Sequence, residues 1–379
     1  MKIDDKTSHN SPSLRFPEFT GEWEKCKIED ITDAVSSGKS KNHFSNGEYN
    51  LYGSTGIIGR TDKALYDGKL VLVARVGANA GFLQIINEPC GITDNTLILK
   101  PKGIDAFYLY YFLQHFNLNR LIFGSGQPLI TGGMLKKVKV SLGTISEQSK
   151  IVKFLSLLDE RIAVQSRLID RLQSLIKGIM VKLQQQGLSK GTWKRVPLSS
   201  ILKERTELNE GLLPVYSVSV SQGVVNQMEY LGRSFAAKDT SKYHVAHFGD
   251  LIYTKSPTGS FPYGIVKQNS NRYKVAVSPL YGVYTPANYF TGVFLQEYFK
   301  SEVNTFNYLH SLIQKGAKNT INITNQRFLD NYILIPTDSN DLQQISNLLL
   351  RLNAKKDLMQ NMLQQYQEQK QYLLRQMFI

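Results

Sequence analysis

Apolar residues recur at alternating steps of four and three through a long stretch near the middle of the chain. The expected seam consists of Ile151, Leu155, Leu158, Ile162, Gln165, Ile169, Leu172, Ile176, Ile179 and Leu183, with a single polar member at Gln165. This spacing is typical of a helix that packs as a coiled coil. Thr144 and Glu147 have the spacing of a capping box, and Gly187 is a typical helix end. The pattern therefore predicts a long helix over residues 146–187.

The same pattern returns near residue 379, where it predicts a second helix over residues 339–379. Residues 147–185 align without a gap onto residues 341–379, at a constant offset of 194. Lysine occupies two positions of this second seam, Lys356 and Lys370, and a long lysine can lie along a seam with its ammonium in water. The other seam residues are Ile345, Leu349, Leu352, Met359, Leu363, Tyr366, Leu373 and Met377. The ungapped match favours a duplication over two unrelated amphipathic helices.

The regions that precede the two helices, residues 1–145 and 188–338, repeat more loosely. Trp23 is matched by Trp193, and Ile130 by Ile323. The offset between matched blocks grows from 170 to 193 residues, so the second region carries insertions. A unit of this length is too long for a solenoid repeat. We therefore expect a pseudo-two-fold internal repeat, in which one chain imitates a symmetric dimer.

Each of these globular regions mixes strand and helix signals, which predicts an α+β fold for both. Apolar runs bounded by turn residues predict strands at 70–73, 96–99, 137–140, 251–254 and 332–335. Residues 106–115 and 293–299 predict short helices. Glycine-rich turns between these segments, such as 124–126, are expected to carry recognition residues.

The charge of the chain indicates what kind of partner it binds. Its 379 residues include 45 Lys and Arg against 31 Asp and Glu, a formal net charge of +14. The excess is spread as +3, +3, +6 and +2 over residues 1–146, 147–186, 187–340 and 341–379, so no segment is a basic tail. A charge spread over folded elements favours a polyanion, with nucleic acid ahead of a membrane surface. A merely soluble basic protein is the alternative.

Cysteine content and hydropathy predict the compartment. Cys26 and Cys90 are too few for a disulfide framework or a zinc cluster, so a reducing, cytoplasmic setting is expected. Residues 1–13 lack the apolar core of a signal peptide, and the apolar runs elsewhere are too short to span a membrane.

Catalytic signatures are missing from the sequence. Gly38-Lys39-Ser40 resembles the end of a P-loop, but the glycine that a P-loop requires would fall at Asp33. His244 and His247 are three residues apart without a further ligand at metal-binding spacing. Neither a nucleophile elbow nor the Asn-Pro-Pro-aromatic tetrapeptide of amino-methyltransferases is present. The sequence thus predicts a chain without catalytic residues, bound cofactor or metal.

For contact with DNA, the useful residues are Arg, Lys, Asn and Gln on loops, together with hydroxyl side chains for phosphates. We take the candidates in the first region as Lys39, Lys41, Arg60, Arg75, Asn79 and Gln127. The candidates in the second region are Arg233, Lys255, Ser256, Arg272, Lys274 and Lys318. A solvated surface role is the alternative for each of these residues, so the hypothesis concerns the set.

With this plan of domain, helix, domain and helix, the chain resembles the specificity subunit of type I restriction–modification systems. The residues that carry the resemblance are Ser146–Leu155 at the start of the first helix, Trp23 and Trp193 at the start of the two regions, and Gly68–Val71 with Gly124–Gly126. Each marker is weak alone, but their order and duplication are specific. In one departure, Asp341–Ile345 lacks the Glu-Gln start of the first helix.

The resemblance implies separate roles for this chain and for its partner subunits. Residues 1–145 and 188–338 would be target-recognition domains, each reading one part of a split, asymmetric DNA site. The two helices would pack antiparallel and set the spacing between the half-sites. Two modification subunits would supply S-adenosylmethionine and methylate adenine, and two restriction subunits would add translocation driven by ATP and Mg²⁺. This chain itself would bind double-stranded DNA and no cofactor.

Two other classes of function remain open from the sequence. A coiled-coil scaffold whose domains bind proteins predicts no salt-dependent DNA binding and leaves the spread charge unexplained. A free-standing enzyme, such as a nuclease with a site built from distant carboxylates, predicts metal-dependent cleavage by the chain alone.

Overall fold

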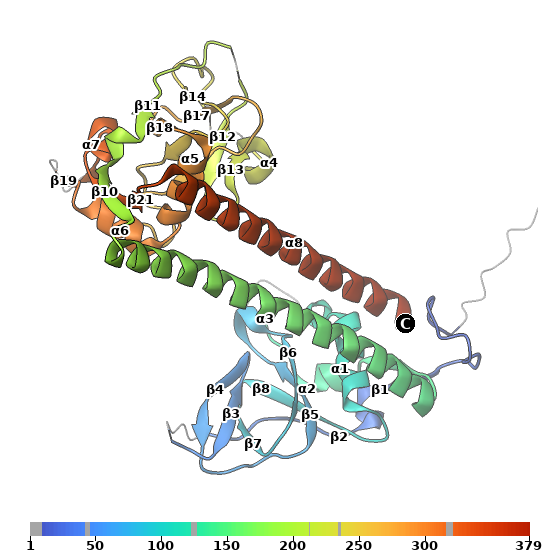
Figure 1. Cartoon of the computed structure of the whole chain (residues 1–379). Helices are drawn as coiled ribbons and strands as arrows, with labels where there is room; N and C mark the ends of the chain where they lie inside the picture. The colour runs from blue at the N-terminus through green and yellow to red at the C-terminus, as the bar shows by residue number, and fades with distance from the viewer. Residues whose placement is uncertain (1–9, 42–45, 123–126, 212, 234–235, 316–320) are drawn as a thin grey trace, which may run out of the picture. The chain divides into compact units, whose positions relative to one another are not determined.

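The computed structural model describes residues 10–41, 46–122, 127–211, 213–233, 236–315 and 321–379. The chain forms two compact units, residues 1–166 with 361–379 and residues 167–360. Figure 1 labels most of their α-helices and strands. Each unit therefore takes in one globular region and part of both long helices, α3 (Ile145–Ser189) and α8 (Ser339–Met377).

The first unit is built around an antiparallel four-stranded sheet. Its strands lie in the order β2 (Thr32–Ser37), β8 (Thr96–Pro101), β5 (Lys69–Ala74) and β6 (Leu83–Asn87). A smaller sheet contains β4 (Gly56–Thr61), β3 (Tyr49–Gly53) and β7 (Cys90–Ile92), and β1 (Glu24–Lys27) pairs with β9 (Lys139–Leu142). The helices are η1 (Ile28–Ile31), η2 (Gly77–Asn79), α1 (Ala106–Phe116), η3 (Leu118–Leu121) and α2 (Gly132–Lys136).

The core of the first unit joins α1 and the sheet to the helix segments of the same unit. Tyr108 and Phe112 of α1 are buried, and the Phe378 ring lies 5.3 Å from the ring of Tyr108. Ile151 and Leu155 from the start of α3 are buried in the same cluster. Burial of each such side chain contributes about 1.5–3 kcal/mol. The start of α3 and the end of α8 therefore belong to the core of this unit.

The second unit repeats the strand order of the first. Its four-stranded sheet is β11 (Leu202–Glu204), β18 (Gly282–Pro286), β15 (Leu251–Tyr253) and β16 (Val266–Gln268), again antiparallel. The remaining strands pair as β10 (Trp193–Pro197) with β21 (Tyr332–Pro336), β12 (Tyr216–Ser219) with β13 (Gly223–Asn226), β14 (His244–Ala246) with β17 (Val275–Val277), and β19 (Gln314–Lys315) with β20 (Ile321–Asn322). The helices are η4 (Leu198–Ser200), α4 (Gln227–Leu231), α5 (Tyr289–Phe299), α6 (Glu302–His310) and α7 (Asn325–Leu329).

The core of the second unit follows the same plan. Phe294 and Phe299 of α5 and Phe328 of α7 are buried with Leu251 of the sheet. Met180 of α3 and Leu349 of α8, both within this unit, join the same cluster. Every predicted seam position on α3 and α8 is buried or half-buried, including the polar Gln165, Lys356 and Lys370.

Three local predictions from sequence were wrong. Gly187 does not end α3, which runs on to Ser189; a Cβ at Gly187 would instead collide with the Trp193 indole. Only half of the capping box forms, because the Thr144 hydroxyl accepts from the Glu147 amide at 3.3 Å while the Glu147 carboxylate binds elsewhere. The strand predicted at 137–140 begins two residues later, since α2 extends to Lys136.

Candidate nucleic-acid interface

Several connections of the first sheet gather at one of its ends. The register pairs Ser37 with Leu97 and Ala74 with Thr96, so β2 and β5 finish where β8 begins. Val73 pairs with Leu83, so β6 begins there too. We call residues 38–41, 75–82, 93–95 and 127–130 the first loop end. The candidates Lys39, Lys41, Arg75, Asn79 and Gln127 all lie on it.

Backbone hydrogen bonds hold the first loop end together. The amide of Arg75 donates to the Asn95 carbonyl at 2.9 Å, and the amide of Ile130 donates to the Arg75 carbonyl at 2.9 Å. The Gly77 amide donates to the Pro128 carbonyl at 3.0 Å, with Gly77 at a φ of +79° that favours glycine. Segments far apart in the sequence are thus fixed side by side.

The candidate side chains at the first loop end differ in exposure. Lys39, Lys41, Asn79 and Gln127 are exposed. Arg75 is half-buried, its Nη1 lies 3.4 Å from the Ser37 hydroxyl, and its buried Nε has no hydrogen-bond partner among the described residues. A cavity of about 550 Å³ opens beside Asn79; its wall includes Phe82, Gln114, Asn117, Asn119 and Lys370.

The Arg60 guanidinium already has hydrogen-bond partners within the protein. Arg60 lies on β4 opposite Asn50. Its Nε donates to the Gly47 carbonyl at 2.6 Å and its Nη2 to the Glu48 carbonyl at 2.7 Å. The guanidinium therefore clamps the backbone that leads into β3, and the prediction of Arg60 as a DNA contact is not favoured by its geometry.

The second sheet gathers its connections in the same way. Glu204 pairs with Tyr284, and Tyr253 pairs with both Gly282 and Val266. The strands β11 and β15 therefore finish where β16 and β18 begin. We call residues 205–208, 254–265 and 278–281 the second loop end. Of the second-region candidates, Lys255 and Ser256 lie on it.

Lys255 is held in an unusual conformation. Its φ is +57°, which is uncommon for a residue with a Cβ. Gly264 lies so close that a Cβ there would come within 2.8 Å of the Lys255 amide nitrogen, and Thr254 donates its amide to the Ile265 carbonyl at 3.1 Å. Burial lowers the pKa of the half-buried Lys255 ammonium, while the nearby Glu204 carboxylate raises it.

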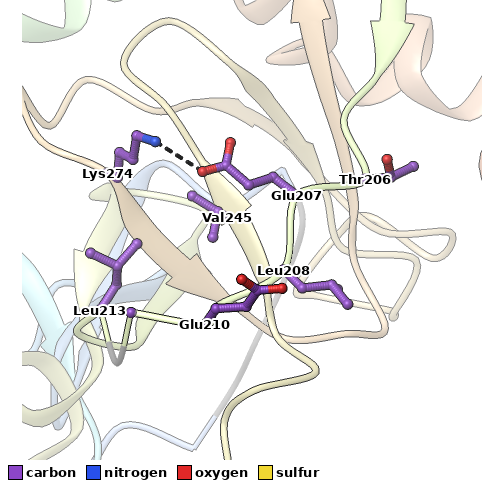
Figure 2. Close-up of a pocket in the computed structure, with 8 residues that line it drawn as sticks. Thr206, Glu207, Leu208, Glu210, Leu213, Val245 and Lys274 are labelled. Atoms are coloured by element: carbon purple, nitrogen blue, oxygen red, sulfur yellow. Dashed lines mark hydrogen bonds and ion pairs between the residues drawn. The ribbon is translucent and has the colours of Figure 1, made fainter.

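Lys274 is exposed, but its charge is already paired. Its Nζ lies 2.9 Å from Glu207 Oε1, the interaction drawn in Figure 2. Glu207 also accepts from His247 Nε2 at 2.5 Å, and Arg205 lies 3.6 Å from the same carboxylate. The hydrogen bond from Lys274, followed by that from His247, lowers the pKa of Glu207. The negative charge of Glu207 thus compensates part of the positive charge of Lys274 and Arg205.

Figure 2 also shows the cavity that this group borders. It has a volume of about 570 Å³, and its wall consists of Thr206, Glu207, Leu208, Glu210, Gly211, Leu213, Val245 and Lys274. The wall holds two carboxylates against the one ammonium of Lys274, which is paired with Glu207, so this cavity offers little attraction for the DNA backbone. Arg272 and Arg233 are exposed elsewhere on the unit, and Lys318 lies outside the described residues, as do Gly124–Gly126.

Sequence reasoning missed two polar groups of the second unit. Arg205 forms a bidentate pair with Asp250, with Nε at 2.6 Å and Nη2 at 3.2 Å from the two carboxylate oxygens. A cavity of about 500 Å³ is bordered by Tyr216 and Tyr273, whose hydroxyls are 2.6 Å apart. Burial, followed by the bond to Tyr273, raises the pKa of Tyr216 to about 12. No sequence motif marks either group, since their members are 45 and 57 residues apart.

The described residues contain no group of three or more His, Cys, Asp or Glu side chains arranged to hold a metal ion. His244 Nδ1 instead lies 2.8 Å from the Tyr281 carbonyl oxygen, and His247 contacts Glu207. Within the same described residues, no helix is long and apolar enough to cross a membrane.

Comparisons with known proteins find similar sequences. The family model for the type I restriction modification DNA specificity domain matches residues 20–174. The chain is 29% identical over 168 residues to the type I restriction enzyme MjaVIII specificity subunit of Methanocaldococcus jannaschii, covering 41% of this chain and 39% of that protein. It is 28% identical over 112 residues to the type I restriction enzyme EcoprrI specificity subunit of Escherichia coli, covering 29% of this chain and 28% of that protein. The matched part thus spans well under half the length of these relatives.

A solved structure agrees in fold. The type I restriction-modification system S subunit from M. genitalium superposes with a TM-score of 0.67 at 16% identity, over 97% of this chain and 99% of that one. At this identity the likeness concerns the fold, while the family model and the curated relatives supply the likeness in sequence. Together these matches show that the chain is similar in sequence, over residues 20–174, to the DNA specificity domain of type I restriction–modification systems and similar in fold to a whole S subunit.

Proposed function

We propose that this chain recognises a split, asymmetric DNA site and directs adenine methylation and restriction by partner subunits. Each globular region would be a target-recognition domain that reads one half-site. The observation that carries this proposal is the repeated sheet, which presents a loop end with a cation within two residues of the end of its third strand in each unit. Two similar reading surfaces in one chain suit a target with two different halves.

The charge of the chain supports phosphate binding. The net charge is +14, and Lys39, Lys41 and Arg272 are exposed. Such side chains would release counterions on binding DNA, so the affinity would fall steeply as salt rises. Base contacts from the loop ends would then discriminate between sequences.

We further propose that α3 and α8 form an antiparallel coiled coil that sets the distance between the half-sites. A helix of 45 residues such as α3 is about 68 Å long at 1.5 Å per residue, which gives an upper limit for that distance. The buried and half-buried seam residues of both helices support the proposal. Whole heptads inserted between Gln165 and Ile176 should lengthen the gap in the DNA site, and an unchanged gap with intact activity would refute the ruler role.

Exposed apolar residues beside the seams of both helices support docking of modification subunits. Leu157, Val164, Leu168 and Leu175 on α3 are 57%, 38%, 42% and 52% exposed, and they lie one position before seam residues. Leu348, Leu358 and Met362 on α8 are exposed at equivalent positions. Apolar residues at this spacing suit a partner helix. The modification subunits would bind S-adenosylmethionine, and the restriction subunits would bind ATP and Mg²⁺, in the cytoplasm where chromosomal DNA lies.

The proposal assigns no catalytic step to this chain, whose part would be to position its partners on DNA. The competing scaffold function would use the same helices for protein contacts but would predict DNA affinity that is weak and independent of sequence. Exchanging residues 190–336 for the second domain of another specificity subunit separates the two. Target recognition predicts that one half of the DNA site changes, whereas a change in both halves would contradict the assignment of one half-site to each domain.

The direct experiment is single-molecule sequencing of host DNA for methyladenine, with and without this gene, beside its modification partner. A split motif that disappears with the gene supports target recognition and reveals both half-sites. If no motif depends on the gene while the partner is expressed and bound, the scaffold function is favoured instead.

A further inference from the structure

Arg75 and Lys255 follow equivalent strands of the two sheets. In each sheet the third strand in spatial order, β5 or β15, runs toward the loop end, and the cation follows within two residues of its last residue. The glycines before these strands, Gly68 and Gly249, differ by 181 in number, so a straight alignment pairs Arg75 with Ser256. The equivalence of the two cations is therefore a property of the fold.

Both cations are half-buried and form no ion pair among the described residues, although the Glu204 carboxylate is near enough to Lys255 to act on it electrostatically. The other buried or half-buried Lys and Arg side chains in the described ranges bind carboxylates, as do Arg15, Arg205, Lys300, Lys356 and Lys370, or backbone carbonyls, as do Lys267 and Arg327. Arg75 has only the Ser37 hydroxyl at 3.4 Å, and its buried Nε is unpaired. No ion pair or side-chain hydrogen bond of Lys255 occurs within those ranges. A partly desolvated cation without a hydrogen-bond acceptor lowers the stability of the folded protein. An acceptor on a bound ligand would therefore offset a desolvation free energy that the unbound protein already carries.

The backbone under each cation is firmly held. Arg75 is bonded through its amide to Asn95 and through its carbonyl to Ile130. Lys255 keeps a φ of +57°, a conformation that persists in a folded protein only where the surroundings impose it. A cation fixed in this way suits contact with a defined atom, whereas exposed cations on flexible stems suit the more uniform phosphate backbone.

We infer that Arg75 and Lys255 each read a guanine through its O6 and N7 atoms in the major groove, one guanine in each half of the split site. The inference rests on the proposed DNA-recognition function. Guanine presents two adjacent acceptors on its major-groove edge, and Arg and Lys are the side chains that most often bind them. The unpaired guanidinium of Arg75 can donate two parallel hydrogen bonds there, and the ammonium of Lys255 can donate to either atom.

The test uses the complex with its modification subunits and compares methylated motifs by single-molecule sequencing. Arg75→Ala should remove the requirement for guanine at one position of one half-site and leave the other half unchanged. Lys255→Gly should do the same in the other half, and glycine at this φ adds no strain. The discrimination against other bases at that position should fall by about 5- to 150-fold. Each variant is the control for the other.

Three further measurements keep the inference falsifiable. Arg75→Lys keeps the charge but cannot form both parallel hydrogen bonds, so it should relax the motif less than Arg75→Ala does. Thermal unfolding should show that every variant is folded. Lys100→Ala removes an exposed charge near the other end of β8 and should leave the motif intact. An unchanged motif in folded Arg75→Ala and Lys255→Gly complexes would overturn the inference. If their salt slopes also fell by about 0.9, the two cations would be phosphate contacts instead. Absence of any split motif with the unaltered chain would refute the proposed function itself.

Discussion

Glu147 is a buried carboxylate whose loss should destabilise the first unit severely. Its side chain has no exposed surface, and it accepts from Arg15 Nε at 2.6 Å, from Arg15 Nη2 at 2.8 Å and from Trp23 Nε1 at 3.0 Å. The hydrogen bond to Glu147 raises the pKa of the Arg15 guanidinium. The three bonds tie residues 15 and 23 to the first turn of α3, and Gly143 leaves the space that the carboxylate fills.

Glu147→Ala removes the anion and leaves the Arg15 guanidinium, only 14% exposed, and the Trp23 indole N–H without their acceptor. Breaking one side of a buried pair costs about 3–5 kcal/mol. For a unit of this size that corresponds to a decrease in Tm of roughly 6–20 °C. Replacement of both partners, in Arg15→Met with Glu147→Leu, should cost less than the single change because no buried charge then remains.

Intrinsic fluorescence during urea unfolding can measure this loss in the first unit alone. The chain has two tryptophans, Trp23 in the first unit and Trp193 in the second, so a Trp193→Phe background leaves Trp23 as the reporter. The matched control is Glu160→Ala, on the same helix within the first unit, where the side chain is exposed and the expected cost is below about 0.5 kcal/mol. A loss of less than about 1 kcal/mol for Glu147→Ala would refute the view that this cluster anchors the helix.

Three other changes test separate parts of the structure. Gly187→Ala places a Cβ against the Trp193 indole and should destabilise the second unit by about 1–3 kcal/mol. The control Gly178→Ala, on the same helix, has open space around the new Cβ and should stabilise the unit by up to about 1 kcal/mol. Equal Tm shifts for the two variants would contradict the close packing of Gly187 against Trp193. Burial lowers the pKa of Lys267 to about 8, below its unfolded value of 10.5, so the unfolded chain binds more protons between these values and stability should rise with pH from about 8 to 10.5. Lys267→Met should abolish this increase of stability with pH and should raise the stability at pH 7 by roughly 1–3 kcal/mol. Urea midpoints at pH 7 and 9.5 measure both effects. An increase with pH that survives the substitution would exclude Lys267 as its source. Arg60→Ala should lower stability by about 1–2 kcal/mol and leave the methylated motif unchanged, and sequencing that showed a relaxed motif would restore Arg60 as a base contact.

The sequence determined the elements that depend on local geometry. The seam from Ile151 to Leu183 repeats at the period of a helix, and the helix spans Ile145–Ser189. The strand predicted at 70–73 is β5, Lys69–Ala74, and the helix predicted at 106–115 is α1, Ala106–Phe116. The predictions agree with the structure because the rise and turn per residue of a helix or strand fix which residues share a face. The spacing of apolar residues along the sequence therefore reveals the local element directly.

Partners that are distant in the sequence were decided only by the tertiary structure. Arg60 and Arg75 look alike as loop arginines, yet one clamps backbone carbonyls and the other is left unpaired. Lys274 looks like a free cation until Glu207, 67 residues away, is found beside it. Arg75 and Lys255 become equivalent only when the strand order is known, because the insertions shift their numbers. Charge, burial and hydrogen bonding at a site are sums over neighbours in space, and a linear pattern records only neighbours along the chain.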